Sequence, residues 1–196
     1  MLQAIFQLFF GILFMRYAPN HKEVTRTRLL TATGALAKKQ GFAATGVDAL
    51  TAAAGMTSGA FYSHFGSKKA LLEAIVENEL NRSLELFSVE SAAQFLAKVH
   101  IYLSEAHVAN PESGCAVPAL TNEIARAGES TQAVFEQGIV RVKDKIATLV
   151  QDEAKAWAVI SMMVGAVSMA RALPTAEARA ALLKGVRQQI GVMVGE

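Results

Sequence analysis

The apolar positions of this chain recur at helical spacing, and the most informative pattern lies in its first half. After Thr45, which is placed to cap a helix, Val47, Leu50 and Ala54 fall on one helical face. Gly55 follows, and a glycine leaves a helix with a positive φ at no steric cost. The pattern therefore predicts a short helix that ends at a glycine turn.

A second short helix is predicted from Ser58 to His64. Thr57 is placed to cap its N-terminus, Gly66 ends it, and Ser67 caps the helix that follows. Its inward-facing residues are Ala60, Phe61 and Phe65. Two short helices around a glycine turn are typical of a helix-turn-helix, in which the second helix reads the major groove of DNA.

A longer helix is predicted before this unit, from His21 to Gln40, and Gly41 ends it. We expect Lys38 and Lys39 to be solvated surface residues. For Arg26 and Arg28, near the start of the helix, a solvated surface and a phosphate contact both remain open. The apolar face of the helix is Val24, Leu29, Leu36 and Ala37.

The remaining chain repeats the helical pattern without a repeat or a low-complexity linker. A connecting helix is predicted over 67–87, and its apolar face is Leu71, Leu72, Ile75, Val76 and Leu80. Further helices are predicted over 91–109, from 114 onward, and over 129–151, 157–170 and 178–194. The segment 157–170 is apolar on all sides, which requires burial on several sides, and Pro174 follows it as a helix breaker.

These elements predict an all-α fold with an N-terminal three-helix helix-turn-helix head and a helical-bundle body. We divide the chain into an apolar extension over 1–14, the head over 15–66, the connecting helix over 67–87 and the body over 88–196.

The extension 1–14 is uncharged and strongly apolar but shorter than the roughly 20 residues of a membrane span. It has neither the basic start nor the small-residue cleavage site of a secretory signal. Three interpretations stay open: Met15 is the natural start, the segment is an extra helix packed on the body, or it anchors the chain to a membrane surface.

Charge supports the division between head and body. The net charge is only +2, but residues 15–82 carry 9 Lys and Arg against 5 Asp and Glu, and residues 83–196 carry 10 against 12. A basic first part on a slightly acidic remainder fits a small nucleic-acid-binding head on a nearly neutral body. The single cysteine, Cys115, excludes an internal disulfide framework and fits a reducing cytosol, so we expect a cytoplasmic protein.

The segment from Gly41 to Leu72 closely resembles the DNA-binding domain of TetR-family repressors. The resemblance rests on G-F-x-A-T, A-A-G-M-T-S-G-A-F-Y-S-H-F and S-K-K-A-L-L, and it covers roughly residues 24–80. A weaker similarity begins at Gly114-Cys115. Thr51 departs from the alanine usual in the family, and Thr33-Gly34 places a glycine inside a helix at a cost of about 1 kcal/mol relative to alanine.

The resemblance implies contact with double-stranded operator DNA. The leading edge of the second short helix would meet base edges, while Tyr62, His64 and Lys68 would meet phosphates. Each also has a structural alternative: a packed Tyr62, a hydrogen-bonded His64 or a solvated Lys68. The predicted DNA-binding residues are Thr45, Thr57, Ser58, Gly59, Ala60, Tyr62, His64 and Lys68.

The resemblance also implies a homodimer. Small residues on one face of the segment 157–170 allow a second helix to approach closely, and two helices from each subunit would form a four-helix contact. The alternative is a core helix within a single chain. The predicted interface residues are Ser161, Gly165, Ser168, Leu182, Val186 and Ile190.

In this family the body binds a small apolar or amphipathic effector that shifts the heads. We therefore expect a mostly apolar pocket with few polar anchors, of which His100, His107 and Asn122 are the most useful. The sequence contains no compact cluster of metal-ligating residues, so no metal site is expected. No cofactor is expected either. A redox role for Cys115 is a minor alternative. The candidate pocket residues are Phe95, His100, Tyr102, His107, Cys115, Asn122, Phe135, Trp157 and Met162.

Together these observations predict a homodimeric transcriptional repressor that a small-molecule effector releases from its operator, with no stable membrane partner. The alternatives are an activator and a helical DNA-binding protein without an effector. An enzyme is not expected, because the sequence shows no nucleophile–base pair, metal motif or phosphate-binding loop.

Overall fold

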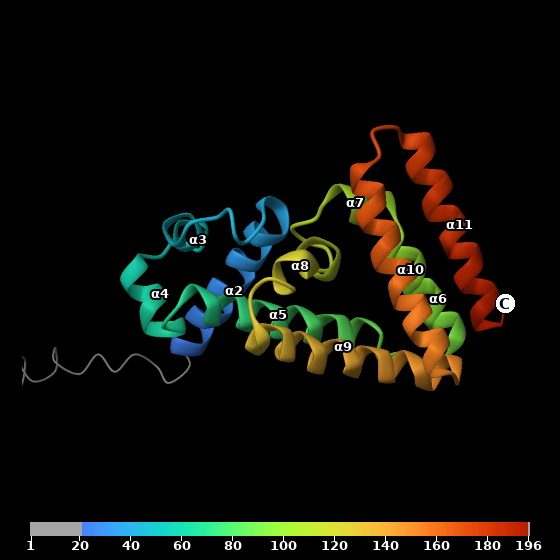
Figure 1. The fold of residues 1–196 in the computed structure, drawn as a ribbon, viewed down its shortest axis with the longest axis horizontal. Coiled ribbons are helices and arrows are strands. Elements are labelled where there is room, and N and C mark those ends of the chain that lie inside the picture. The colour runs from blue at the N-terminus through green and yellow to red at the C-terminus, as the bar shows by residue number, and fades with distance from the viewer. Residues whose placement is uncertain (1–20, 196) are drawn as a thin grey trace, which may run out of the picture.

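Ten helices, labelled α2 to α11, form the described part of the chain, residues 21–195, in this computed structural model (Figure 1). The predicted extension over 1–14 lies outside the described residues. The head contains α2 (His21–Gln40), α3 (Val47–Ala53) and α4 (Ser58–Phe65), and α5 (Lys68–Leu86) leads from it into the body.

The predicted all-α architecture is confirmed. The head lies at one end of the molecule, and α5 and α9 run side by side toward α6, α10 and α11 at the other end (Figure 1). None of the helices within residues 21–195 has the length and hydropathy that a membrane span requires. The helices of the body are α6 (Ala92–Tyr102), α7 (Glu105–Ala109), α8 (Val117–Ile124), α9 (Glu129–Val150), α10 (Glu153–Ala172) and α11 (Ala176–Val194).

The helix caps in the head follow the sequence closely, with one exception. Thr57 accepts a hydrogen bond from the Ala60 N–H, and Ser67 caps α5 in the same way. The predicted cap at Thr45 is wrong, because Gly46 occupies the N-cap position of α3. Thr45 is buried, and its hydroxyl donates to the Gly41 carbonyl at 2.6 Å. It therefore stabilises the turn between α2 and α3.

The single helix predicted over 91–109 is also wrong, because the structure divides it into α6 and α7. Ser104 caps α7 by accepting a hydrogen bond from the His107 N–H. The Leu103 carbonyl, at the end of α6, accepts a hydrogen bond from Arg187 of α11 at 2.6 Å. A serine suited to an N-cap and an arginine distant in sequence together end the first helix.

Two predictions for α2 are wrong. Val24, assigned to its apolar face, is an exposed side chain. Lys38, expected in solvent, has a side chain that is only 1% exposed. Buried lysines are rare unless an acid neutralises them, and Lys38 has such a partner on α5.

The backbones of α5 and α9 approach each other closely at Gly138, in the middle of α9. A Cβ atom at this position would overlap the side chain of Leu80, which is buried on α5. Gly34 of α2 is different, because an added Cβ there would lie at an ordinary 3.6 Å from Ile75 and Glu79. Of these two helical glycines, only Gly138 is needed for close packing.

We therefore expect opposite effects from alanine at these two positions. Gly138→Ala should lower the free energy of unfolding by about 1–2 kcal/mol, because overpacking outweighs the gain in helix propensity. Gly34→Ala should raise it by up to about 1 kcal/mol. Urea denaturation at a fixed protein concentration measures both values, and stabilisation by Gly138→Ala would contradict the close contact.

Candidate DNA-binding surface and ligand pocket

The N-terminal edge of α4 is open to solvent. Thr57 and Gly59 are exposed, and Ala60 is half-buried. Ser58 is also half-buried, and its hydroxyl donates to a carboxylate oxygen of Asp48 on α3 at 2.7 Å. This bond fixes α4 relative to α3, so the two helices present one defined edge.

Tyr62 and His64, which follow this edge in α4, differ in their exposure to solvent. Tyr62 is 55% exposed and packs edge-on against Phe61, with the ring centroids 4.8 Å apart. His64 is half-buried near Phe65. Tyr62 thus combines an anchored ring with an exposed position, which suits a contact with a polyanion.

Lys68 and Thr45 occupy less accessible positions than the sequence predicts. The Lys68 ammonium donates to the Ala43 carbonyl at 3.1 Å and lies 5.0 Å from the centre of the Phe42 ring. Thr45 is buried. Both side chains hold the turn between α2 and α3. Lys69, which the sequence analysis did not select, is the exposed cation in the first turn of α5.

A cavity of about 440 Å³ opens in the body between α5 and the segment from α6 to the α7–α8 loop. The side chains of Leu86 and Ile101 are exposed around it, although both are apolar. Of the nine candidate pocket residues, the cavity brings together Tyr102, His107 and Cys115.

The other six candidates do not line this cavity. Phe95 belongs to the core, His100 lies in a separate groove between α6 and α11, Asn122 is exposed, Phe135 and Met162 are partly buried against the core, and Trp157 is 41% exposed. Helical periodicity identifies inward-facing residues, but it does not show which of them border an empty space.

Tyr102 stands at the inner end of the cavity. Its side chain is 5% exposed, and its buried hydroxyl has no hydrogen-bond partner within residues 21–195. Burial, and next the nearby Cys115 thiol, raise the pKa of Tyr102 well above its usual value. The hydroxyl therefore stays protonated at neutral pH and can donate to an acceptor in the cavity. It also borders a small apolar space enclosed by residues such as Ile146 and Met163.

His107 holds the loop that forms one wall of the cavity. Its Nε2 accepts from the Cys115 N–H at 2.9 Å, and its Nδ1 lies 2.6 Å from the Tyr102 carbonyl. A carbonyl only accepts, so Nδ1 carries the proton of the neutral ring. Burial lowers the pKa of His107, which favours this neutral form. Since both ring nitrogens are engaged, His107 positions the wall instead of presenting a free group to a ligand.

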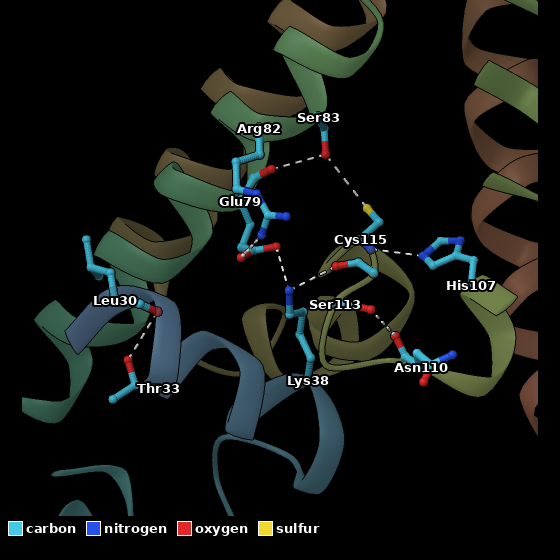
Figure 2. A network of polar contacts seen from close by, with 11 residues as sticks. Leu30, Thr33, Lys38, Glu79, Arg82, Ser83, His107, Asn110, Ser113 and Cys115 are labelled. Atoms are coloured by element: carbon cyan, nitrogen blue, oxygen red, sulfur yellow. Dashed lines mark hydrogen bonds and ion pairs between the residues drawn. The ribbon is translucent and has the colours of Figure 1, made fainter. Parts of the chain in front are cut away.

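Lys38 connects this wall to the head (Figure 2). Its ammonium donates to Glu79 on α5 and to the Gly114 carbonyl in the α7–α8 loop, both at 2.9 Å. The other carboxylate oxygen of Glu79 accepts from Arg82 at 3.0 Å. Glu79, Arg82 and Gly114 all line the cavity. A head residue thus binds two groups of the cavity wall.

Glu123 makes a second connection between head and body. This α8 carboxylate accepts backbone hydrogen bonds from Phe42 at 3.0 Å and from Ala43 at 2.6 Å. Both amides follow the end of α2, so α8 and the loop before it hold the same end of that helix.

Comparison with known proteins agrees with this arrangement. A sequence profile for bacterial regulatory proteins of the tetR family matches residues 29–75, which include most of α2, all of α3 and α4, and the start of α5. Residues 29–75 therefore match the TetR family, which the motif in the head also resembles. A search of curated proteins found no match.

Solved structures show that the TetR-family fold extends over the body. The reduced form of NemR from Escherichia coli shares 20% identity, covers 86% of this chain and 97% of its own, and has a TM-score of 0.72. A TetR transcriptional regulator from Chloroflexus aurantiacus shares 24% identity over 86% of this chain and 95% of its own, with a TM-score of 0.70. A TetR-family regulator from Cytophaga hutchinsonii has a TM-score of 0.68 at 20% identity, covering 88% and 94%.

Two of the predicted interface residues are engaged within this chain. Ile190 is fully buried in the protomer, so it lacks the surface that a dimer contact needs. The Ser168 hydroxyl donates to the Pro118 carbonyl of α8 at 3.2 Å. Ser161 is exposed and Gly165 half-buried, and an added Cβ on Gly165 would meet nothing within 4 Å. Both therefore remain available for a partner.

The buried ion pair predicts an asymmetry between single and double substitutions. Lys38→Met should lower the free energy of unfolding by about 3 kcal/mol, because it leaves the buried Glu79 carboxylate with Arg82 as its sole cation. Lys38→Met combined with Glu79→Met should recover most of this loss, since no buried charge is left unpaired. Chemical denaturation tests this, and equal losses in the two variants would contradict it.

His107 predicts a dependence of stability on pH. Its folded pKa lies below the unfolded value of about 6.5, so the unfolded chain takes up a proton first as the pH falls. The contribution of His107 to stability is therefore complete above pH 6.5 and decreases as the pH falls toward the folded pKa. Denaturation between pH 5 and 8 should show a decrease that is smaller in His107→Gln; equal profiles would contradict it.

Proposed function

We propose that this TetR-family protein is a homodimeric transcriptional repressor that a small molecule releases from duplex DNA. The observation that carries the DNA-binding part is the exposed N-terminal edge of α4, held in place by the bond between Ser58 and Asp48. The edge is narrow and bears small side chains, so the helix backbone can lie deep in a major groove about 12 Å wide.

The proposed contacts divide by chemistry. Thr57, Ser58, Gly59 and Ala60 would face base edges, whereas Tyr62 and His64 would face phosphates. Lys68 is included through its position at the N-terminus of α5, where the helix dipole favours an anion, although its ammonium already binds the Ala43 carbonyl. We leave Thr45 out of the direct contacts because it is buried.

The effector would occupy the cavity between α5 and the α7–α8 loop. Exposed Leu86 and Ile101 favour an apolar part in the ligand, and the unpaired Tyr102 hydroxyl favours an oxygen or nitrogen acceptor. The Glu79 carboxylate is already neutralised by Lys38 and Arg82, so it offers little attraction for a cationic ligand.

The dimer would form through α10 and α11. Trp157 and Met169 of α10 are 41% and 59% exposed in the single chain. Tryptophan and methionine are enriched at protein interfaces, so their exposure here favours a dimer contact on this helix. Ser161 and Gly165 on the same helix permit a close approach, and Leu182 and Val186 of α11 are half-buried. Such a dimer places two α4 helices in one assembly, as two half-sites about 34–36 Å apart require.

The function is tested by fluorescence anisotropy on DNA from the region upstream of the gene, with scrambled DNA as the reference. We expect at least a roughly thousandfold preference for the upstream DNA and an affinity that decreases with salt. Equal, weak binding to both DNAs would contradict a sequence-specific regulator. Selective binding with no response to any of a panel of small amphipathic compounds would favour the DNA-binding protein without an effector.

Tyr62 gives a residue-level test of the DNA contact. Tyr62→Phe should weaken binding roughly tenfold on upstream and scrambled DNA alike, because it removes one hydrogen bond to a phosphate. The matched control is Tyr102→Phe, which removes the same hydroxyl from the body and should leave DNA affinity unchanged when no effector is present. A loss confined to the upstream DNA would instead assign Tyr62 to base recognition.

A further inference from the structure

We propose that Lys38 is the residue through which the head senses the contents of the cavity. Its hydrogen bond to the Gly114 carbonyl would be kept in the DNA-binding state and broken when a ligand displaces the α7–α8 loop. This inference rests on the proposed control of DNA binding by an effector, and it identifies the contact that transmits the control.

Lys38 is suited to this role by burial and by charge. Its side chain is 1% exposed, and its ammonium binds the Glu79 carboxylate and the Gly114 carbonyl, both at 2.9 Å. A buried ammonium tolerates the loss of an acceptor poorly, because no water replaces it. If Gly114 is displaced, the Lys38 ammonium should therefore withdraw toward water. A slightly longer hydrogen bond to the Gly114 carbonyl would be the less favourable outcome.

The cavity reaches both acceptors of Lys38 but not Lys38 itself. Glu79 and Gly114 line the cavity, together with His107 and Cys115. Gly114 passes so close to the His107 ring that a Cβ at position 114 would overlap it. The Cys115 N–H, next in the chain, donates to the same ring. A ligand that moves this ring or the Cys115 side chain must therefore also move the Gly114 carbonyl.

The position of Lys38 near the end of α2 carries the change into the head. After α2 ends at Gln40, the Phe42 ring contacts Lys68, and the Ala43 carbonyl accepts from the ammonium of that lysine. Lys68 begins α5 directly after α4. The turn after α2 precedes α3, and Lys68 follows α4. A movement at Lys38 would thus be transmitted to the chain on both sides of the pair of helices α3 and α4, which presents the DNA-binding edge.

Glu123 offers a competing path. Its carboxylate accepts from the Phe42 and Ala43 amides, so α8 could move the head without Lys38. The two paths differ in chemistry, because one contains a buried cation and the other a carboxylate on backbone amides. Substitutions at Lys38 and at Glu123 therefore distinguish the two paths.

The experiment uses Cys115, the single cysteine of the chain, to place a defined probe in the cavity. Hexyl methanethiosulfonate forms a mixed disulfide with the Cys115 thiolate and releases methanesulfinate. Methyl methanethiosulfonate adds a small group by the same reaction and is the reference. Mass spectrometry verifies complete labelling, with Cys115→Ser as the unreactive control. A thiol that does not react would contradict a cavity open at Cys115 and overturn the proposal.

Two readouts are compared between the hexyl and methyl forms. Affinity for the upstream DNA should fall about 5- to 150-fold in the hexyl form, the usual range of allosteric coupling. Hydrogen exchange of the amides of residues 37–43, measured without DNA, should accelerate roughly tenfold as this end of α2 loosens.

The decisive variant combines Lys38→Met with Glu79→Met, which removes the contact and leaves no buried charge unpaired. In this variant the hexyl and methyl forms should differ less than about twofold in both readouts. Lys39→Met, an exposed lysine one position along, is the matched control and should retain the full difference. A full difference between the hexyl and methyl forms of the double variant would overturn the proposal. If Glu123→Gln then abolished that difference, the coupling would be assigned to the Glu123 path.

The two readouts also separate this inference from the proposed function. If the protein fails to select the upstream DNA, the proposed function fails, but an exchange difference that depends on Lys38 would still establish the coupling. If selective DNA binding is present and neither readout responds to the hexyl group, the coupling through Lys38 fails and the regulator stands.

Discussion

A buried cation sets the relation between the two parts of this molecule. The ammonium of Lys38 lies where water does not reach it, so it needs the carboxylate of Glu79 and the carbonyl of Gly114 at the same time. These groups belong to α2, α5 and the α7–α8 loop, three segments far apart in the sequence. The electrostatic requirement of one side chain therefore holds the head against the body, together with the hydrogen bonds from the Phe42 and Ala43 amides to Glu123.

The cavity wall depends on a second group that must keep one charge state. His107 accepts from one backbone amide and donates to one backbone carbonyl, an arrangement that only the neutral ring with its proton on Nδ1 permits. Burial lowers the pKa of this histidine and so favours the required form. The wall is therefore ordered by polar contacts, while the interior behind Tyr102 is apolar.

The sequence predicted the architecture well because local rules govern it. The all-α fold, the bounds of α2, and the caps at Thr57 and Ser67 follow from periodicity and from side-chain oxygens that bind nearby amides. The family followed from the motif in the head, which the profile match confirms.

Two of the errors concern contacts between residues distant in sequence. Lys38 looks solvated because its acid partner lies 41 positions away, and the end of α6 depends on Arg187, 84 positions after Leu103. The candidate cavity was predicted in part, since Tyr102, His107 and Cys115 border it and the other six candidates do not. Which inward-facing residues surround an empty space is a property of packing in three dimensions, and no local pattern contains it.

The bond between Ser58 and Asp48 has a consequence for recognition at the tip of α4. A serine hydroxyl has one hydrogen, and here that hydrogen is given to the Asp48 carboxylate. The oxygen of Ser58 can then only accept. In the major groove the groups that donate are the amino groups of adenine and cytosine, whereas thymine and guanine present acceptors. In the proposed contact, a base that meets Ser58 would thus be selected for carrying an amino group, and Asp48 of α3 would set this preference through its bond to Ser58.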